Sequence, residues 1–190
     1  MLKLTVIIVS TRPGRVGLPI GHWFYDYAKQ HGKFEVNLAD LKEMNLPLLD
    51  EPRHPRLRQY EQPHTRAWSA IIDKSDAYVF VTPEYNYGAP PSLLNALDYV
   101  FLEWNYKPAG FVSYGGISGG LRSVQMTKQV LTTLKVMPIP DAVIIPFVGQ
   151  FINEEGEFVP SQTLEKSADV LLDELLRWAE ALLPMRTKAQ

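Results

Sequence analysis

Apolar residues recur along this chain in two alternating spacings, one typical of buried strands and the other of helices. Five segments are short apolar runs or alternate with period two, and they predict β-strands at residues 4–9, 34–38, 77–82, 110–113 and 142–145. Between them, apolar residues recur every three or four positions, which predicts helices at residues 20–31, 65–74, 93–101, 121–134 and 164–183. Residues 40–63 show neither spacing and contain four prolines, so they are expected to form a long loop.

Strands that alternate with helices predict a mostly parallel sheet covered on both faces, in one domain spanning residues 1–190. In such α/β sheets, ligands bind at the carboxyl ends of the strands. The segments after the first, third and fourth predicted strands are rich in Gly, Pro, Ser, Tyr and Asn, whereas the segment after the second strand is not. The functional site is therefore expected in those three loops.

Composition narrows the function classes. With 46% hydrophobic and 21% charged residues, the 190-residue chain matches an ordinary globular protein, and its formal net charge of −2 disfavours a general nucleic-acid binder. The absence of cysteine excludes a disulfide framework, a thiol nucleophile and a zinc–thiolate site, so any redox chemistry must come from a bound cofactor. The four histidines lack metal-ligand spacing, so no metal site is expected. No segment approaches the roughly 18 apolar residues of a membrane span, and a cytoplasmic protein is expected.

The loop from Ser10 to Ile20 lies between a buried strand and the start of a helix. Free backbone N–H groups and the helix dipole favour an anion there, and two hydroxyls and two arginines, Arg12 and Arg15, add donors. The loop matches neither a Walker A sequence nor G-x-G-x-x-G, because the nearby glycines fall at 14, 17 and 21. It therefore predicts a phosphate site with Arg12 as the main charged contact. The alternative is an ordinary strand-to-helix turn with solvated arginines.

Two further loops suit a flat ligand. The segment Pro83 to Gly88 reads Pro-Glu-Tyr-Asn-Tyr-Gly and offers aromatic surfaces on a turn, and Tyr114-Gly-Gly offers backbone without side chains. Both follow neighbouring strands of the predicted sheet, across from the predicted phosphate loop. A planar heterocycle is expected between them, although each segment by itself is also typical of an ordinary turn.

One motif carries a family resemblance. The stretch Thr82-Pro-Glu-Tyr-Asn-Tyr-Gly, continued by Leu93-Leu-Asn-Ala-Leu-Asp, resembles the NADPH-dependent FMN reductases and their quinone, azo-dye and chromate reductase relatives. The resemblance covers Val6 to about Phe147. Its quinone reductase branch looks most similar at three short stretches, Glu103-Trp, Lys107-Pro and Ser113-Tyr-Gly-Gly. The resemblance implies a flavodoxin-like, three-layer α/β/α fold with a doubly wound, five-stranded parallel sheet in the order 2-1-3-4-5.

The resemblance also implies FMN as the cofactor and suggests its binding residues. The phosphate is expected at Ser10, Arg12 and the backbone of the residues that follow, Arg15, Gly17, Leu18, Pro19 and Ile20. The isoalloxazine ring is expected against Pro83, Glu84, Tyr85, Asn86 and Tyr87, with the site closed by Tyr114, Gly115 and Gly116.

By the same resemblance, NAD(P)H is the cosubstrate. Hydride passes to flavin N5, the nicotinamide leaves, and a small-molecule acceptor takes its place in a ping-pong cycle; the acceptor is a quinone, flavin, azo compound or metal oxyanion. The cofactor carries this chemistry, so no side chain is assigned as a catalytic acid or base. The resemblance further implies a homodimer, and an aromatic cluster of Tyr85, Tyr87, Trp104 and Tyr106 is expected at its interface. For Trp104 the core and the acceptor pocket are alternatives.

Two other function classes stay open at this point. A flavodoxin-type electron carrier binds FMN but is typically strongly acidic, whereas this chain is near neutral. A non-catalytic flavin-binding sensor module is not separated from the enzyme by fold alone. The basic run from Arg53 to Arg58 adds a candidate contact for the 2′-phosphate of NADPH, although loop arginines are commonly just solvated.

Overall fold

Five parallel strands form the centre of the protein, in the order β2-β1-β3-β4-β5. The computed structural model describes residues 1–187. Its strands are β1 (Lys3–Ile8), β2 (Glu35–Asp40), β3 (Ala77–Pro83), β4 (Pro108–Tyr114) and β5 (Met137–Ile145). Strands β3 and β4 are buried throughout, whereas β2 at one edge is largely open to solvent. This burial explains why the central strands are continuous apolar runs while the edge strand alternates.

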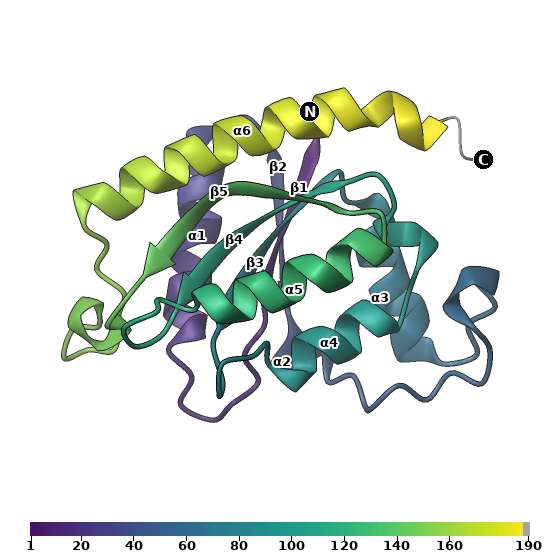
Figure 1. The fold of residues 1–190 in the computed structure, drawn as a ribbon, viewed down its shortest axis with the longest axis horizontal. Helices are drawn as coiled ribbons and strands as arrows, with labels where there is room; N and C mark the ends of the chain where they lie inside the picture. Colours follow the sequence, from purple (N-terminus) through teal and green to yellow (C-terminus); the bar gives the residue numbers. More distant parts are fainter. Residues whose placement is uncertain (188–190) are drawn as a thin grey trace.

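Helices cover both faces of the sheet (Figure 1). One layer contains α1 (Gly17–His31) and the long α6 (Gln162–Thr187), and the other contains α3 (Pro63–Lys74), α4 (Pro91–Asp98) and α5 (Leu121–Thr133). The first strand serves both layers, since Leu4 and Val6 pack in the α1–α6 layer while Ile7 packs in the other. The predicted three-layer fold and strand order are confirmed. Within residues 1–187, no helix is both long and apolar enough to span a membrane.

Helix α6 crosses β4 at close range. A Cβ atom on Gly110 would lie 2.5 Å from a methyl carbon of Leu171, so only glycine lets the helix and the strand approach this closely. Leu172 and Leu175 of α6 are buried in the same layer, and burying a leucine side chain contributes about 1.5–3 kcal/mol. Strand β4 is thus held firmly before its carboxyl end reaches the candidate site.

The structure differs from the predicted elements most clearly in three places. Strand β5 begins at Met137 rather than at residue 142, because an edge strand tolerates Pro138 and Pro140, which the sequence pattern treats as a break. The first helix begins at Gly17 rather than at residue 20. Residues 40–63 are not a loop throughout, since they contain the short helix α2 (Leu41–Met44) and a 3-10 turn at Pro55–Leu57.

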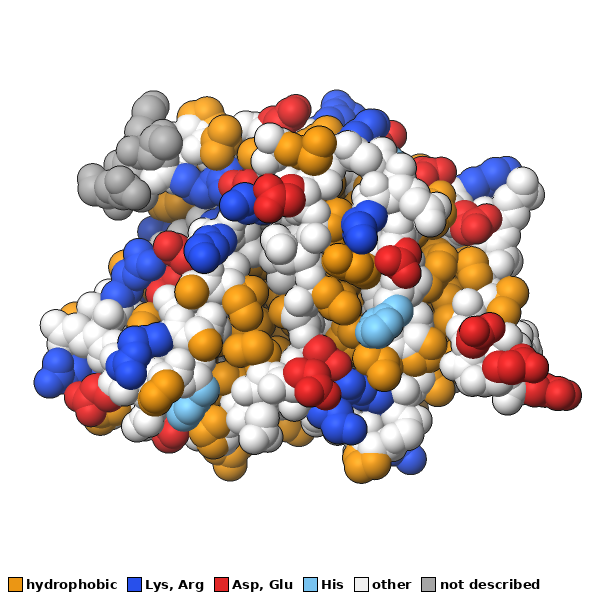
Figure 2. All heavy atoms as spheres, turned by 180° about the vertical axis from the view of Figure 1, so that it is seen from behind, with side chains coloured by type: hydrophobic (Ala, Val, Ile, Leu, Met, Phe, Trp, Pro, Cys, Tyr) orange, Lys and Arg blue, Asp and Glu red, His pale blue; other side chains and the backbone are white. Residues whose placement is uncertain are grey.

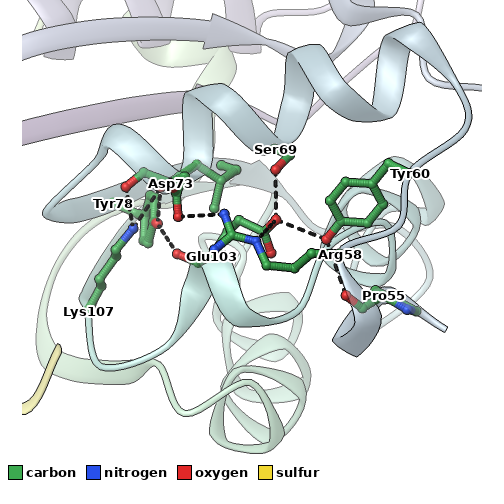
Figure 3. Close-up of polar contacts among 9 residues, drawn as sticks. Pro55, Arg58, Tyr60, Ser69, Asp73, Tyr78, Glu103 and Lys107 are labelled. Atoms are coloured by element: carbon green, nitrogen blue, oxygen red, sulfur yellow. Dashed lines mark hydrogen bonds and ion pairs between the residues drawn. The ribbon is translucent and has the colours of Figure 1, made fainter. Parts of the chain in front are cut away.

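The long loop between α2 and α3 is anchored to a buried carboxylate, Glu103 (Figure 3). Glu103 Oε1 accepts hydrogen bonds from Tyr60 Oη at 2.9 Å and from Ser69 Oγ at 2.7 Å, and Arg58 Nε lies 3.3 Å away. Hydrogen bonds to a charged carboxylate are stronger than those between neutral groups. Glu103 itself lies in the segment that precedes β4, at the amino edge of the sheet. The loop is therefore held against the amino edge of the sheet.

Candidate functional site

Three loops meet at the carboxyl edge of the sheet, where the sequence predicts the site (Figure 1). They follow β1, β3 and β4. A hydrogen bond of 2.8 Å joins Ser10 Oγ in the first loop to Tyr85 Oη in the second. Ser92 Oγ, at the start of α4, donates to Val9 O at 2.7 Å. The predicted phosphate segment and the predicted ring segment are therefore neighbours.

The Arg15 side chain turns inward rather than toward a ligand. Its Nη1 donates to Asp40 Oδ1 at 2.8 Å and to Ser10 O at 2.7 Å, and its Nη2 lies 2.5 Å from Asp40 Oδ2. Only 6% of this side chain is exposed. The paired contact with Asp40 fixes the first loop to the end of β2. The prediction that both arginine side chains of the loop offer free donors is therefore wrong for Arg15. Only the backbone of Arg15 remains available to bind a phosphate.

The start of α1 is an uncapped helix N-terminus. Val16 precedes it without a side-chain cap, and its first turn has no acidic residue. The leading N–H groups of a helix lack intrahelical partners and carry partial positive charge, which attracts an anion. Arg12 is exposed in the loop that leads into the helix and makes no ion pair with any residue that the structure describes. These groups suit a phosphate.

Tyr114 closes the candidate site from beneath α1. A Cβ atom on Gly17 would lie 2.2 Å from Tyr114 Oη, so the phenol occupies the space that any larger residue at position 17 requires. The side chain is buried, and burial raises the pKa of its hydroxyl, as does the neighbouring Tyr85, while Ser10 and Arg15 oppose the rise. Tyr114 therefore stays neutral and keeps its proton at ordinary pH.

The loop after β3 presents an aromatic ring on a tight turn. Tyr85 and Gly88 exchange two backbone hydrogen bonds of 3.1 and 2.9 Å, and Asn86 and Tyr87 between them have φ values of 49° and 68°. Two successive left-handed residues form a type I′ turn, which asparagine adopts far more readily than tyrosine. Tyr87 is 72% exposed, so a bulky ring is held outward in a strained conformation of the kind that clusters at binding sites.

Glu84 joins the second loop to the third. Arg122 Nε donates to Glu84 Oε1 at 2.6 Å, and Ser118 Oγ and the Arg122 backbone N–H donate to Oε2 at 2.8 and 3.0 Å. Desolvation raises the pKa of Glu84, but the hydrogen bonds from Arg122 and Ser118 outweigh it and hold this pKa below its ordinary value. The Arg122 guanidinium also lies 3.8 Å from the centre of the Tyr87 ring. Sequence reasoning missed Arg122 and Ser118. The signal that could have identified them is their position on either side of Gly119–Gly120, where α5 begins.

The third loop offers open backbone. Gly115 N donates to Ile145 O at 3.2 Å, and Gly116 O accepts from Phe147 N at 2.9 Å, so the segment after β5 supports this loop. A Cβ atom on Gly116 would meet no atom of the described residues within 4 Å. The loop therefore leaves room for a flat ligand against its backbone.

The predicted aromatic cluster does not exist as one surface. Tyr85 and Tyr87 follow β3 at the carboxyl edge, whereas Trp104 and Tyr106 precede β4 at the opposite, amino edge. Trp104 is fully buried, and its ring centre lies 4.8 Å from that of Tyr78. Trp104 is therefore a core residue rather than a dimer contact or part of an acceptor pocket, and the argument for a dimer from this cluster is wrong.

The basic run from Arg53 to Arg58 also lies at the amino edge. Arg58 bridges Glu103 and Asp73, with its Nη2 3.1 Å from Asp73 Oδ1, and Arg56 lies 4.4 Å from the centre of the Phe101 ring. These arginines stabilise the long loop far from the three loops of the candidate site. The expected contact with the 2′-phosphate of NADPH is therefore not supported by their position.

Comparison with known proteins identifies the family. The sequence model described as NADPH-dependent FMN reductase matches residues 2–150, well over half of the chain. The chain belongs to this family. It is 40% identical over 148 residues to an NAD(P)H-dependent FMN reductase of Schizosaccharomyces pombe, which covers 76% of this chain and 74% of the relative.

Other relatives agree with this family. An NAD(P)H-dependent FMN reductase of Nectria sp. is 33% identical over 155 residues, which is 78% of this chain and 77% of that protein. Among solved structures, the flavoenzyme FerB of Paracoccus denitrificans, an NAD(P)H:(acceptor) oxidoreductase, matches with a TM-score of 0.75 at 19% identity. The match covers 95% of this chain and 98% of FerB, and at this identity it supports the fold alone.

Proposed function

We propose that this family member is an FMN-dependent NAD(P)H oxidoreductase whose flavin lies across the three loops at the carboxyl edge. Family membership gives FMN as the cofactor and NAD(P)H as the cosubstrate. The observation that carries the placement is the uncapped start of α1 beside exposed Arg12, next to an open glycine loop. When bound, FMN accepts hydride from the nicotinamide and passes it to an acceptor.

The first loop holds the phosphate end in this proposal. Arg12 brings a free guanidinium, and the backbone N–H groups of Gly17 and Leu18, which precede the first intrahelical hydrogen bond, have no side-chain cap. Pro19 has no N–H and suits the first turn of a helix for that reason. Ser10 is buried at the start of the loop with its hydroxyl bonded to Tyr85, and together with the inward Arg15 side chain it holds the loop in shape.

The second and third loops hold the ring end. The segment Pro83–Tyr87, in which Asn86 and Tyr87 are exposed, contributes one wall, Gly115–Gly116 contributes the other, and Tyr114 closes the base beneath α1. The hydrogen bonds between Glu84 and Arg122 tie the two walls together and fix their spacing. In this arrangement the side chains bind and orient a planar ring, and none is required to transfer a proton.

One flavin face serves donor and acceptor in turn, which gives ping-pong kinetics. The described sheet has one switch point, between β1 and β3, and therefore one position for a nucleotide. Tyr87, exposed and backed by Arg122, is placed to stack on a planar molecule that enters above the ring. The acceptor is a quinone, a flavin, an azo compound or a metal oxyanion.

The protein is a homodimer in this proposal, for a reason other than the aromatic cluster. A cavity of about 620 Å³ lies between α4, α5 and the long loop, with Leu49, Phe101 and Val130 in its walls. Leu49, in its wall, and Leu57, which follows the lining residue Arg56 in the chain, are exposed. Large exposed apolar patches usually mark interaction surfaces, and a second copy presenting the same surface covers this one symmetrically.

Turnover tests the activity. Purified, FMN-loaded protein is expected to oxidise NADPH steadily with a quinone or free flavin as the acceptor. A flavodoxin-type carrier passes electrons only to a protein partner, and a sensor module sustains no turnover, so flavin-loaded protein that fails to oxidise NADPH with these acceptors contradicts the proposal. A cytoplasmic location and a single domain over residues 1–190 stay predictions.

A further inference from the structure

A cavity of about 500 Å³ opens beside the first loop, between α2, the segment that follows α2, and the start of α4. Thr11 of the first loop and Ser92 of α4 both line it. In the view from behind, basic side chains lie beside apolar ones at the lower margin of the molecule, where Figure 1 shows the first loop and α2 (Figure 2). The volume is within the roughly 300–1,000 Å³ of small-molecule sites, and the function proposed above assigns no ligand to this cavity.

A chain of hydrogen bonds connects the cavity wall formed by α2 to the loops proposed for the flavin. Asp40 directly precedes α2, and Arg15 Nη1 donates to Asp40 Oδ1 at 2.8 Å and to Ser10 O at 2.7 Å. The hydroxyl of Ser10 in turn lies 2.8 Å from Tyr85 Oη in the second loop. The cavity is therefore a near neighbour of the wall proposed for the flavin ring.

Lys42 supplies the charge of this cavity. It is the one charged residue among the described residues that line the cavity, and its exposed ammonium group forms no ion pair within residues 1–187. The carboxylate of Asp40 is already paired with Arg15 through both of its oxygens, and Glu43, the residue after Lys42, does not line the cavity. A free ammonium group without a competing carboxylate favours an anionic ligand such as a phosphate.

The other walls suit a heterocyclic base and a sugar. Leu46, Leu48 and Pro91 provide apolar surface, and the side chain of Leu48 is 82% exposed. Thr11 and Asn45 add a hydroxyl and an amide at the same cavity. Apolar walls with a few polar groups are typical of sites that hold a drug-sized ligand, so this cavity combines surface for a flat base with a cation for a phosphate.

A cavity on the other side of the first loop has the opposite charge. It has a volume of about 570 Å³, begins at Pro19 of α1 and is lined by Asp26, Glu157 and Glu165, with no lysine or arginine among its described lining residues. Carboxylates repel phosphates, so this cavity disfavours a phosphorylated ligand. A phosphorylated molecule that extends from the flavin ring is therefore directed toward the cavity beside α2.

We propose that the cavity beside α2 binds the adenosine end of NADPH, with Lys42 on the 2′-phosphate and Leu48 against the adenine. The inference rests on the function proposed above, because the nicotinamide of the same molecule must reach the flavin ring. NADH has no 2′-phosphate and makes no contact of this kind with Lys42. Lys42 is thus a specificity-determining residue that favours NADPH over NADH.

Titration calorimetry on the FMN-loaded protein tests this assignment with 2′,5′-ADP and 5′-AMP, which differ only in the 2′-phosphate. The wild-type protein is expected to bind 2′,5′-ADP about tenfold or more tightly, because only this nucleotide makes the charge-assisted contact. Lys42→Met is expected to remove this preference and to change the affinity for 5′-AMP little, whereas Lys42→Arg keeps the cation and retains the preference. Lys166→Met is the matched control, because Lys166 is an exposed lysine on α6.

Steady-state kinetics give a second readout, in which Lys42→Met is expected to raise the KM for NADPH about tenfold and the KM for NADH little. Equal affinity of the wild-type protein for the two nucleotides, no measurable binding of 2′,5′-ADP, or an unchanged preference in Lys42→Met overturns the inference. An equal loss of both nucleotides in Lys42→Met also overturns it, since Lys42 then acts only on the fold. A wild-type protein that does not oxidise NADPH contradicts the proposed function instead, and the calorimetry still decides whether the cavity binds the 2′-phosphate.

Discussion

The phenol oxygen of Tyr114 occupies the space beside the α-carbon of Gly17, where a Cβ atom would lie only 2.2 Å from it. This contact brings the end of β4 directly beneath the first turn of α1. This contact therefore fixes the position of the helix start, proposed to bind the phosphate, relative to the glycine loop, proposed to bind the ring.

Replacing Gly17 with alanine is expected to weaken FMN binding about tenfold or more, and to lower the free energy of unfolding by about 1–3 kcal/mol, because the added methyl group overlaps Tyr114. Flavin fluorescence titration and denaturant unfolding measure the two effects. Gly149→Ala is the control, since a Cβ atom there meets no described atom within 4 Å. Adding Tyr114→Phe to Gly17→Ala should recover part of the loss, and unchanged FMN affinity in Gly17→Ala contradicts this geometry.

Arg12→Ala is expected to weaken FMN binding roughly tenfold or more and to leave the binding of riboflavin, which has no phosphate, little changed. Arg15→Ala is the contrasting variant, because Arg15 holds Asp40 and the carbonyl of Ser10. Loss of the Arg15 side chain should loosen the loop and weaken the binding of both FMN and riboflavin. Parallel titrations with FMN and riboflavin separate the two roles. An equal loss of affinity for both ligands in Arg12→Ala would show that Arg12 does not bind the phosphate.

These two arginines show how far the sequence predicts this site. Both stand in one loop, yet the partner of Arg15 is Asp40, 25 residues away at the end of β2, and such a tertiary ion pair leaves no local pattern. The buried strands are predictable because helices cover both of their faces, so they appear as apolar runs. The three loops are predictable because parallel strands end at one edge.

The aromatic residues illustrate the opposite case. Tyr85 and Trp104 are close in the sequence, but helix α4 carries the chain between them from the carboxyl edge back to the amino edge. Composition alone does not distinguish a ring on a site loop from a ring in the core, since both are aromatic residues flanking the same helix. The burial of Trp104 against Tyr78 becomes visible only once β3 and β4 are paired.

Glu84→Gln tests the link between the second and third loops through its pH dependence. The folded-state pKa of Glu84 is lowered, so its stabilisation is fully present above the ordinary pKa of 4.5 and is lost as pH falls through the folded-state pKa. Urea unfolding of the wild-type protein and Glu84→Gln should differ most above pH 4.5 and converge in acid. A difference in stability that grows toward low pH contradicts the ionised pair with Arg122.

Lys107 is expected to make the stability depend on pH in the alkaline range. Burial lowers the pKa of Lys107 from 10.5 to about 8, so the folded protein binds fewer protons at this group than the unfolded chain does between those two values. Stability therefore rises with pH across that window for the wild-type protein relative to Lys107→Met. Urea unfolding of both proteins at matched pH measures the effect, and a relative stability that falls from pH 8 to 10.5 contradicts it.

Leu49→Glu places a charge in the apolar cavity between α4, α5 and the long loop, and it is expected to convert the proposed dimer to a monomer. Sedimentation equilibrium of the wild-type protein should give about twice the chain mass of 21.6 kDa. Val170→Glu is the control, because this exposed residue lies on α6, in the opposite layer. A wild-type protein that sediments as a monomer at micromolar concentration rules out the dimer.

Anaerobic mixing of the FMN-loaded protein with NADPH tests most directly the central claim, that a flavin at the carboxyl edge passes hydride between two small molecules at one site. The visible absorption of the flavin is expected to bleach stoichiometrically with NADPH alone, and to return when a quinone is added after the oxidised nicotinamide has been removed. A flavin that keeps its absorption until the quinone is present contradicts the account.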